Sequence, residues 1–383
     1  MKKKIKVLYI HHSASNSGSA RSLSFLINSL DKNKYVPYVV IFCDYDRQKK
    51  LFEEAGAKVV FVKGLGAWHG STVSGMSLRI LLSNIIHAIP TYILTRKIIK
   101  KIKPDIVHLN STCLFICAWS IKKYNKNIPI ICHVREPLLD GLFGNILRKY
   151  NEQYVDRFIA IHEYDAESIH SKKKIDIVYN FVDFNIYNPN VKSNILREEL
   201  GLNNYDTICL YLARIAPSNG ALELLENSKD ILEKRKDIHY CIVGFNRKNK
   251  YNKKVINLAN QYENVHILKF RSDVQNVIAS CDINIVPFTE PHSARSIIEC
   301  SSMRKVSIGT NIGSIKELIK NNETGYLFES NYKDFDDKLL KLVDDKNIRN
   351  KMQDNAYKFA LDNFNSKKNI KKIIKVYDEI IKF

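Results

Sequence analysis

The chain has 383 residues, 45% of them apolar, so it is long enough for two globular domains with ordinary cores. Its formal net charge is +20, with the larger excess of Lys and Arg in residues 1–185, which favours acidic partners such as anionic lipid, a lipid diphosphate or nucleic acid. Nucleic acid is not expected as a partner, since no motif interleaves aromatic and basic residues, and a Lys- and Asn-rich composition also gives such a charge without any partner.

The amino-terminal segment has a basic start, but its apolar run is too short for a secretory signal, so it is interpreted as a first strand. No membrane-spanning helix is expected, because the best window, Met76–Leu94, is interrupted by Arg79, Asn84, His87 and Pro90. The eight cysteines lie mostly in apolar runs without the spacing of a metal site. They indicate core residues of a cytoplasmic protein.

Short runs rich in Val and Ile alternate with helical stretches, which is the pattern of parallel strands joined by crossover helices. The first half predicts strands at Ile5–Ile10, Tyr38–Cys43, Lys58–Val62, Asp105–Leu109, Ile128–Cys132, Arg157–Ile161 and Ile175–Val178. After an Asn- and Pro-rich linker the pattern restarts, with strands at Thr207–Leu212, His239–Val243, Val265–Leu268, Ile283–Val286 and Val306–Ile308. Three amphipathic helices close the chain, at Lys333–Val343, Asn347–Asn363 and Ser366–Ile381.

The restart of the pattern predicts an α/β fold with two doubly wound domains in series. In open sheets of this type ligands bind beyond the carboxyl ends of the strands, so the active site is expected in a cleft between the domains.

One segment, Pro287–Phe328, is the most informative. It predicts a turn after a buried strand, a helix beginning near Ser293, a second strand, a short helix and a turn at Thr324–Gly325. Helix starts that follow strand ends collect unsatisfied N–H groups and the positive end of the helix dipole. They suit an anionic ligand such as a diphosphate, and a nucleotide is the expected ligand.

Five motifs in this order resemble those of the family 4 retaining glycosyltransferases of the GT-B fold. They are SGSARSL (Ser17–Leu23), HVREP (His133–Pro137), VYNFVD (Val178–Asp183), YLARIAPSNG (Tyr211–Gly220), and SARSIIEC together with GTNIGSIKEL. The resemblance implies transfer of a sugar from a nucleotide-diphosphate donor, without cofactor or metal and with retention of the anomeric configuration. It also implies a saccharide or lipid-linked acceptor in the assembly of bacterial surface polysaccharide or glycolipid.

The resemblance further implies two Rossmann-like domains of the GT-B type. Residues 1–185 form an acceptor-side domain, on which a carboxyl-terminal helix at about 365–383 packs back. Residues 186–364 form the domain that binds the nucleotide sugar. The protein is expected in the cytoplasm, either free or bound peripherally to the inner face of the cell membrane.

Arg214 follows a buried strand, from where a guanidinium can bind a diphosphate and neutralise charge as the leaving group departs. The alternative is a surface arginine at a strand end. Five residues later, where the family has a lysine, the chain has Asn219, which donates hydrogen bonds but brings no charge. Leaving-group stabilisation is therefore expected to depend more on Arg214 and on helix N-termini.

Glu299 lies on the helix expected near Ser293, and the resemblance assigns its carboxylate to both hydroxyls of a ribose. The alternative is an ion pair with Arg295, four residues earlier. Arg295 is itself a candidate phosphate ligand, and the donor is also expected to contact Ser293 and Ala294 at the start of the helix.

A second family carboxylate is expected eight residues before Glu299, where the chain has Pro291. Its neighbour Glu290 either reaches the sugar hydroxyls through a one-residue bulge or is a solvated loop acid. His133 ends a strand, and the resemblance implies that it hydrogen-bonds the donor sugar, the alternative being a structural histidine. Arg214, His133 and Glu290 form the predicted catalytic set.

Gly18 and Ser19 are expected in the loop after the first strand, where small residues let backbone N–H groups approach a phosphate or the acceptor. The segment Ile267–Val274 stands where the family holds the nucleotide base, and Arg271 within it is expected to bind the donor. The segment Leu94–Lys103 predicts a basic amphipathic helix that either lies on anionic lipid or packs on the sheet as a solvated outer helix.

Two further functions fit the same residues. A nucleotide-sugar epimerase on this fold would need acid and base carboxylates and no acceptor. A non-catalytic nucleotide-sugar-binding assembly partner is favoured by Asn219 and Pro291, which depart from the family pattern.

Overall fold

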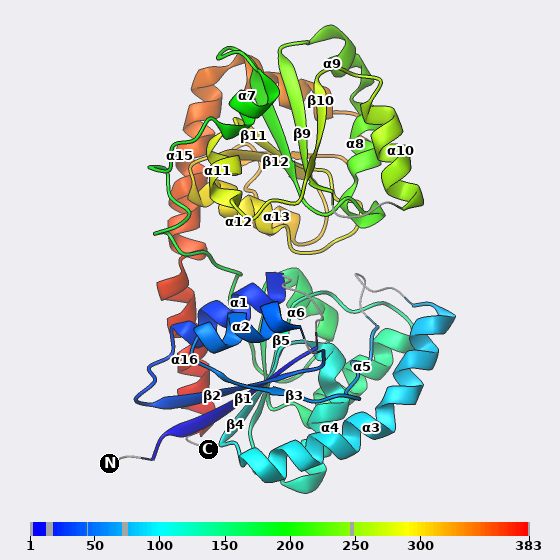
Figure 1. The fold of residues 1–383 in the computed structure, drawn as a ribbon, viewed down its shortest axis with the longest axis vertical. Helices are drawn as coiled ribbons and strands as arrows, with labels where there is room; N and C mark the ends of the chain where they lie inside the picture. Colours follow the sequence, from blue (N-terminus) through cyan, green and yellow to red (C-terminus); the bar gives the residue numbers. More distant parts are fainter. Residues whose placement is uncertain (1–2, 13–17, 44, 71–75, 246–248, 382–383) are drawn as a thin grey trace. The chain divides into compact units, whose positions relative to one another are not determined.

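The computed structural model describes residues 3–12, 18–43, 45–70, 76–245 and 249–381 (Figure 1). The chain divides into two compact units. Unit 1 contains Met1–Asn180 and Lys367–Phe383, and unit 2 contains Phe181–Ser366. Each unit has one parallel sheet with helices packed on it, which confirms the predicted α/β class of two doubly wound domains.

Within the described residues, the sheet of unit 1 has the strand order β3-β2-β1-β4-β5-β6-β7. Leu8 pairs in parallel register with Tyr38 on one side and Val107 on the other, so the order reverses between β1 and β4. Sheets of this type bind ligands at that reversal, beyond the carboxyl ends of the strands. The strands are β1 (Ile5–His11), β2 (Tyr35–Ile41), β3 (Lys58–Phe61), β4 (Ile106–Leu109), β5 (Ile130–Val134), β6 (Arg157–Ala160) and β7 (Ile175–Ile177).

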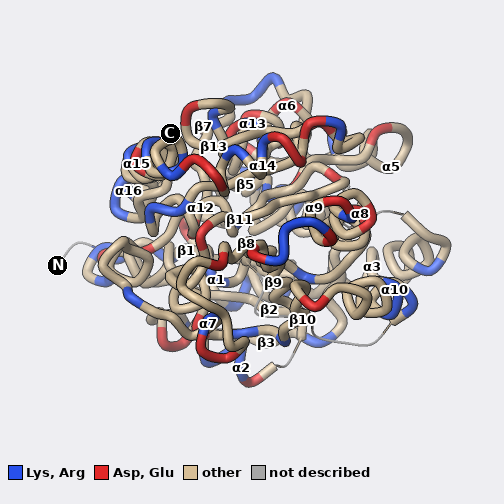
Figure 2. The backbone as a smooth tube through the Cα atoms, turned by 90° about the horizontal axis from the view of Figure 1, so that it is seen from above, with Lys and Arg blue, Asp and Glu red and all other residues tan. Residues whose placement is uncertain are grey.

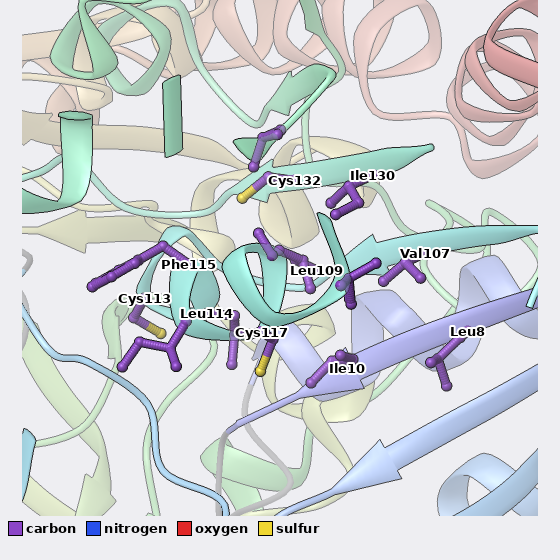
Figure 3. Packing of buried hydrophobic residues seen from close by; sticks show 14 of the residues in the cluster. Leu8, Ile10, Val107, Leu109, Cys113, Leu114, Phe115, Cys117, Ile130 and Cys132 are labelled. Atoms are coloured by element: carbon purple, nitrogen blue, oxygen red, sulfur yellow. The ribbon is translucent and has the colours of Figure 1, made fainter. Parts of the chain in front are cut away.

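The core of unit 1 lies between this sheet and its helices. Figure 3 shows side chains of β1, β4 and β5 packed against α4 (Phe115–Tyr124) and the residues just before it. Cys117 and Cys132 are fully buried there, and burial raises the pKa of Cys117 to about 12, so these thiols are core residues as predicted. The other helical elements of unit 1 are α1 (Gly18–Asn28), α2 (Asp46–Glu54), α3 (Leu78–Ile102), η1 (Thr112–Leu114), α5 (Leu142–Tyr154), α6 (Glu163–Ile169) and α16 (Ser366–Ile381).

The sheet of unit 2 has the order β10-β9-β8-β11-β12-β13 in the described residues, with its reversal between β8 and β11. The strands are β8 (Thr207–Leu212), β9 (Ile238–Phe245), β10 (Val265–Lys269), β11 (Ile283–Val286), β12 (Val306–Thr310) and β13 (Gly325–Phe328). The helical elements are α7 (Ile195–Leu200), η2 (Pro217–Asn219), α8 (Ala221–Asn227), α9 (Lys229–Lys234), α10 (Lys250–Ala259), α11 (Val274–Ala279), α12 (Arg295–Ser302), α13 (Ile315–Leu318), α14 (Phe335–Asp344) and α15 (Lys346–Asn363).

A turn lies at Asn322–Thr324, next to the predicted position, and the strand β13, which was not predicted, begins directly after it at Gly325. Gly325 pairs with Ser307 of β12, and a Cβ on Gly325 would lie 2.1 Å from the Ser307 carbonyl oxygen. The glycine therefore follows the turn and permits close approach of two strands. The helix predicted near Ser293 is α12, which begins at Arg295 with Ala294 as its N-cap.

The carboxyl-terminal helix α16 is part of unit 1. Tyr377 is fully buried, and its hydroxyl oxygen lies 3.1 Å from that of Tyr9. At the surface, Arg157 of β6 donates to Glu379 at 2.6 Å and to Asp176 of β7 at 2.6 Å. These contacts fix α16 against the sheet.

One described helix, α3, is long and apolar enough to cross a membrane by length and composition alone. It is also the crossover between β3 and β4, and Ile98, Ile99 and Ile102 in its last turns are buried in the core of unit 1.

Lys and Arg residues occur on elements of both units and are interspersed with Asp and Glu residues (Figure 2).

Candidate active site

In unit 2 the predicted donor residues, apart from Arg271, lie in two loops that follow the strands at the sheet reversal or on the helix α12 that continues the second loop. Arg214 comes after β8, and the loop then passes through η2 to Gly220, whose φ is +69°. A Cβ on Gly220 would lie 1.7 Å from the carbonyl oxygen of Pro287, which follows β11. Only glycine allows this approach, so it brings the two loops into contact.

Hydrogen bonds hold the second loop against the first. The Thr289 hydroxyl donates to the carbonyl of Pro217 at 2.8 Å, and the Thr289 amide donates to the carbonyl of Ser218 at 3.1 Å. The second loop continues directly into α12. Segments about 70 residues apart in the sequence are thus joined next to the first turn of this helix.

The side chain of Arg214 is exposed, while its carbonyl accepts a hydrogen bond from the Tyr211 hydroxyl at 2.9 Å. His292, which was not predicted, stacks on Phe288 with ring centroids 4.3 Å apart. Burial lowers the pKa of His292 to about 4, and the cation of Arg214 contributes to that shift. A neutral imidazole and an exposed guanidinium therefore stand near each other.

Asn219 is 4% exposed and belongs to the loop itself, since its Oδ1 accepts from the Ser218 hydroxyl at 3.0 Å. A buried amide here stabilises the loop without adding charge. Glu290 is exposed, and its carbonyl oxygen lies 2.8 Å from Nδ1 of His292. Asn219 remains a predicted donor-binding residue, and Glu290 remains a predicted catalytic residue.

Glu299 is 5% exposed and forms the predicted alternative contact, since Nε of Arg295 lies 2.8 Å from its Oε1. Arg295 also donates to the carbonyl of Phe181 at 3.5 Å, which connects α12 to the VYNFVD segment. Ser293 and the buried Ala294 lie just before this pair. The ion pair holds a carboxylate and a guanidinium one helical turn apart on the same face of α12.

The guanidinium of Arg271 is occupied by two carboxylates. It donates to both oxygens of Glu199 at 2.7 and 2.6 Å and to those of Asp273 at 2.9 and 2.7 Å, and these bonds raise its pKa. A diphosphate would have to displace one of these partners. The adjacent Phe270 is 62% exposed, and its flat ring is better suited to contact a base.

In unit 1 the predicted His133 lies at the end of β5 and is 3% exposed. Its Nδ1 is 3.2 Å from Nε2 of His108, and Nδ1 of His108 is 2.6 Å from the Tyr377 hydroxyl. Burial lowers the pKa of both histidines, with the Arg135 cation contributing, to about 3 for His108. Nε2 of His133 has no hydrogen-bond partner among the described residues, so the neutral ring presents one unpaired nitrogen.

Arg135 and Asn110 extend this network and were not predicted. Nε of Arg135 donates to Oδ1 of Asn110 at 2.8 Å, and Nδ2 of Asn110 lies 2.8 Å from Nδ1 of His11. Their sequence signals are the arginine inside HVREP and an asparagine directly after the buried strand β4. The network therefore joins the carboxyl ends of β1, β4 and β5, at the sheet reversal of unit 1.

Gly18 and Ser19 open α1 and do not lie in a loop, which corrects their predicted position. The carbonyl of Ser19 lies 3.5 Å from Nδ2 of Asn110, so α1 begins beside the same network. Residues 13–17, including Ser17 of the predicted Gly-rich motif, lie outside the described residues. Among the residues that the structure describes, no group of three or more His, Cys, Asp and Glu side chains could hold a metal ion.

Two family models match the chain one after the other. Residues 16–185 match the model described as Glycosyltransferase Family 4, and residues 192–359 match the model described as Glycosyl transferases group 1. Together they span nearly all of both units.

Curated relatives agree with this match. The chain is 26% identical over 308 residues to the UDP-Gal:α-D-GlcNAc-diphosphoundecaprenol α-1,3-galactosyltransferase of Escherichia coli, covering 74% of this chain and 78% of the relative. It is 24% identical over 248 residues to the N,N′-diacetylbacillosaminyl-diphospho-undecaprenol α-1,3-N-acetylgalactosaminyltransferase of Campylobacter jejuni, covering 62% and 64%. Its fold is similar to that of Anabaena HepE in complex with UDP, with a TM-score of 0.80, 17% identity and coverage of 98% and 100%.

Proposed function

Because the chain belongs to the family 4 glycosyltransferases of the GT-B fold, which act in bacterial polysaccharide and glycolipid assembly, we propose that it transfers a sugar from a nucleoside-diphosphate sugar to a saccharide or lipid-linked acceptor. The observation that carries the proposal is the contact between the Arg214 loop and the Thr289 loop at the sheet reversal of unit 2. An exposed guanidinium beside the first turn of a helix suits a diphosphate.

The proposed reaction retains the anomeric configuration and needs no metal. The leaving phosphate assists the incoming hydroxyl, and Arg214 stabilises the charge that develops as the diphosphate departs. Because Asn219 brings no charge, Arg214 carries more of this stabilisation. Glu299 accepts from the ribose hydroxyls, while Glu290 and His133 contact the transferred sugar.

The proposed donor is a UDP-sugar, and the proposed acceptor is a sugar diphosphate on a polyprenol. The Escherichia coli and Campylobacter jejuni relatives are named for sugars linked to diphosphoundecaprenol, and Anabaena HepE binds UDP. Unit 1, which matches the Glycosyltransferase Family 4 model, is the proposed acceptor side. The corresponding location is the cytoplasmic face of the membrane, with the protein held peripherally.

The test is a panel of nucleotide sugars, each incubated with the full chain and a synthetic polyprenyl-diphosphate sugar. We expect one UDP-sugar to give a glycosylated acceptor in which NMR shows the anomeric configuration of the donor, and we expect EDTA to leave the rate unchanged. Nucleotide binding without turnover of any donor would identify a non-catalytic binding partner. Conversion of the donor sugar without an acceptor would identify an epimerase, and either result would contradict the proposal.

A further inference from the structure

The first four turns of α3 expose large apolar residues, which is unusual for a helix that faces water. Six large apolar side chains are exposed by 48% to 74%, the largest value belonging to Leu78. Their spacing places them on one stripe of the helix, about 100° wide at 100° per residue. The stripe consists of Leu78, Leu82, Ile85, Ile86, Ile89 and Ile93.

The opposite side of these turns faces the unit, and its fully buried side chains are polar. The buried Asn84 side chain both accepts from the His69 amide and donates to the His69 carbonyl, each at 3.0 Å. The buried Thr91 hydroxyl likewise accepts from the Gly66 amide at 2.8 Å and donates to its carbonyl at 3.2 Å. Polar side chains therefore hold α3 to the loop before it, and the fold does not use the apolar stripe.

Towards its carboxyl end the same stripe becomes basic. Arg96 and Lys100 continue it at helical spacing, both are exposed, and both lie over the ring of Tyr124, at 5.6 and 5.8 Å from its centroid. The helix has five Lys and Arg residues and no Asp or Glu (Arg79, Arg96, Lys97, Lys100 and Lys101). An apolar stripe that ends in cations matches the layers of an anionic membrane surface.

Aromatic side chains lie next to this helix. Tyr92 of α3 lies 4.9 Å from Trp119 of α4, which in turn stacks on Tyr154 of α5 at 6.4 Å. Trp119 is 37% exposed and Tyr124 is 38% exposed. Trp and Tyr are the residues enriched where a membrane meets water, because one side of each ring is apolar and the other is polar.

We infer that the stripe Leu78–Ile93 of α3 is a docking surface for an anionic phospholipid bilayer, with Arg96 and Lys100 at the lipid phosphates. The helix lies on the bilayer and does not cross it, because its last turns, which lead into β4, are buried in the core of unit 1. Of the two alternatives for Leu94–Lys103, the apolar residues Ile98, Ile99 and Ile102 follow the second, because they pack into that core. The inference therefore takes only exposed cations from this segment and takes its apolar contact from the stripe.

Two other partners for the apolar stripe are less well supported. A second copy of the chain would bring two α3 helices of the same positive charge together. An unrelated protein would need an acidic, apolar counterpart, whereas an anionic bilayer supplies both properties in one surface. The inference deepens the proposed function, since a polyprenol-linked acceptor lies in a membrane, but it depends only on the surface of α3.

The experiment is co-sedimentation of the full chain with vesicles, either equimolar phosphatidylglycerol and phosphatidylcholine or phosphatidylcholine alone. We expect binding to the anionic vesicles that weakens with salt, and at least 10-fold weaker binding to the neutral ones. Both double variants, Ile86→Gln with Ile89→Gln and Arg96→Gln with Lys100→Gln, should bind at least 10-fold less well than the wild type. Their melting temperatures should be unchanged, because all four side chains are exposed.

Matched controls lie in unit 2. Tyr205→Gln removes a side chain that is 76% exposed, and Lys253→Gln with Lys254→Gln removes two exposed cations. Both controls should bind vesicles like the wild type. Equal binding by the α3 variants, no binding by the wild type, or a dimer in analytical ultracentrifugation that only the α3 variants lose, would overturn the inference. UDP binding, measured on the same samples by thermal shift, reports on unit 2 and so separates this result from failure of the proposed function.

Discussion

Nδ1 of His133 lies 3.2 Å from Nε2 of His108, and the two imidazole rings are stacked with their centroids 5.3 Å apart. Two protonated rings at this distance would repel each other inside the core, and burial lowers the pKa of both histidines, which favours neutral rings. The contact joins the carboxyl ends of β4 and β5 and leaves Nε2 of His133 buried without a partner among the described residues. A neutral imidazole held in this way can hydrogen-bond a sugar hydroxyl. Because it carries no charge, it does not compete with the arginines for the diphosphate.

The buried histidines predict a fall in stability in acid. Burial lowers the pKa of His12 and His108 to about 3 and holds the pKa of His11 and His133 well below the usual value. Between about pH 6.5 and pH 3 the unfolded chain therefore binds protons that the folded chain does not, and the free energy of unfolding falls as pH falls. The slope has an upper limit of about 1.4 kcal/mol per pH unit for each such histidine.

Urea unfolding between pH 7.5 and 4.5 measures this slope. His108→Gln should reduce it, while His170→Asn, which replaces an exposed histidine at a left-handed position that asparagine tolerates, should leave it unchanged. A free energy of unfolding that does not change over this range would contradict the neutral network.

Asn219→Lys tests whether the loop after β8 holds a diphosphate. Because Asn219 is 4% exposed, a lysine here loses hydration in the free protein and gains a partner only when an anion is bound. We expect a lower melting temperature without ligand and a larger rise on adding UDP than in the wild type. Asn219→Gln adds length without charge and should show only the first effect. An identical response of the two variants to UDP would contradict the assignment of the loop.

Glu299→Gln separates ribose binding from a purely structural ion pair. If the carboxylate accepts from ribose hydroxyls, its loss should weaken UDP binding by roughly 10- to 100-fold in calorimetry, because hydrogen bonds to charged groups are strong. If Glu299 only pairs with Arg295, the melting temperature should fall while UDP affinity stays the same. Glu233→Gln, at an exposed glutamate of α9 outside the quoted motifs, is the control and should leave UDP affinity unchanged.

Arg271→Gln tests the structural role that its two carboxylate partners give it. Loss of the contact to Glu199 should loosen α7 and lower the free energy of unfolding by about 1 kcal/mol, a modest value because Glu199 is partly exposed. UDP affinity should change little. Phe270→Ala should do the reverse, with weaker UDP binding and unchanged stability, since its ring is exposed. A strong loss of UDP affinity in Arg271→Gln alone would restore Arg271 as a donor ligand.

The sequence predicted the sheets well because buried parallel strands appear as short Val- and Ile-rich runs. Strand β8 was predicted with its ends, whereas β13 was missed, since its glycine has the signature of a turn. The close approach of Gly325 to Ser307 depends on the pairing of β12 with β13, which are separate segments of the sequence. Local pattern cannot distinguish the two uses of a glycine.

The site shows the same division. Arg214 and Glu299 could be placed from their motifs, but the contact of Thr289 with Pro217 links segments that only the sheet order brings together. Arg135 lies inside the HVREP motif but was not predicted to belong to the site, because an arginine after a strand is usually solvated. Its bond to Asn110 depends on β4 and β5 being neighbours. The exposed stripe of α3 was not predicted, because the apolar face of a helix is usually its buried face.

The most direct test of the central claim is sugar transfer by wild type, Arg214→Ala and Lys254→Ala, with the active nucleotide sugar and a polyprenyl-diphosphate sugar. Arg214 is exposed, so its removal should leave the fold intact and lower kcat/KM by about 100-fold or more, while Lys254→Ala keeps wild-type kinetics. Equal kinetics for the two variants, or no transfer by the wild type from any donor in the panel, would contradict the account.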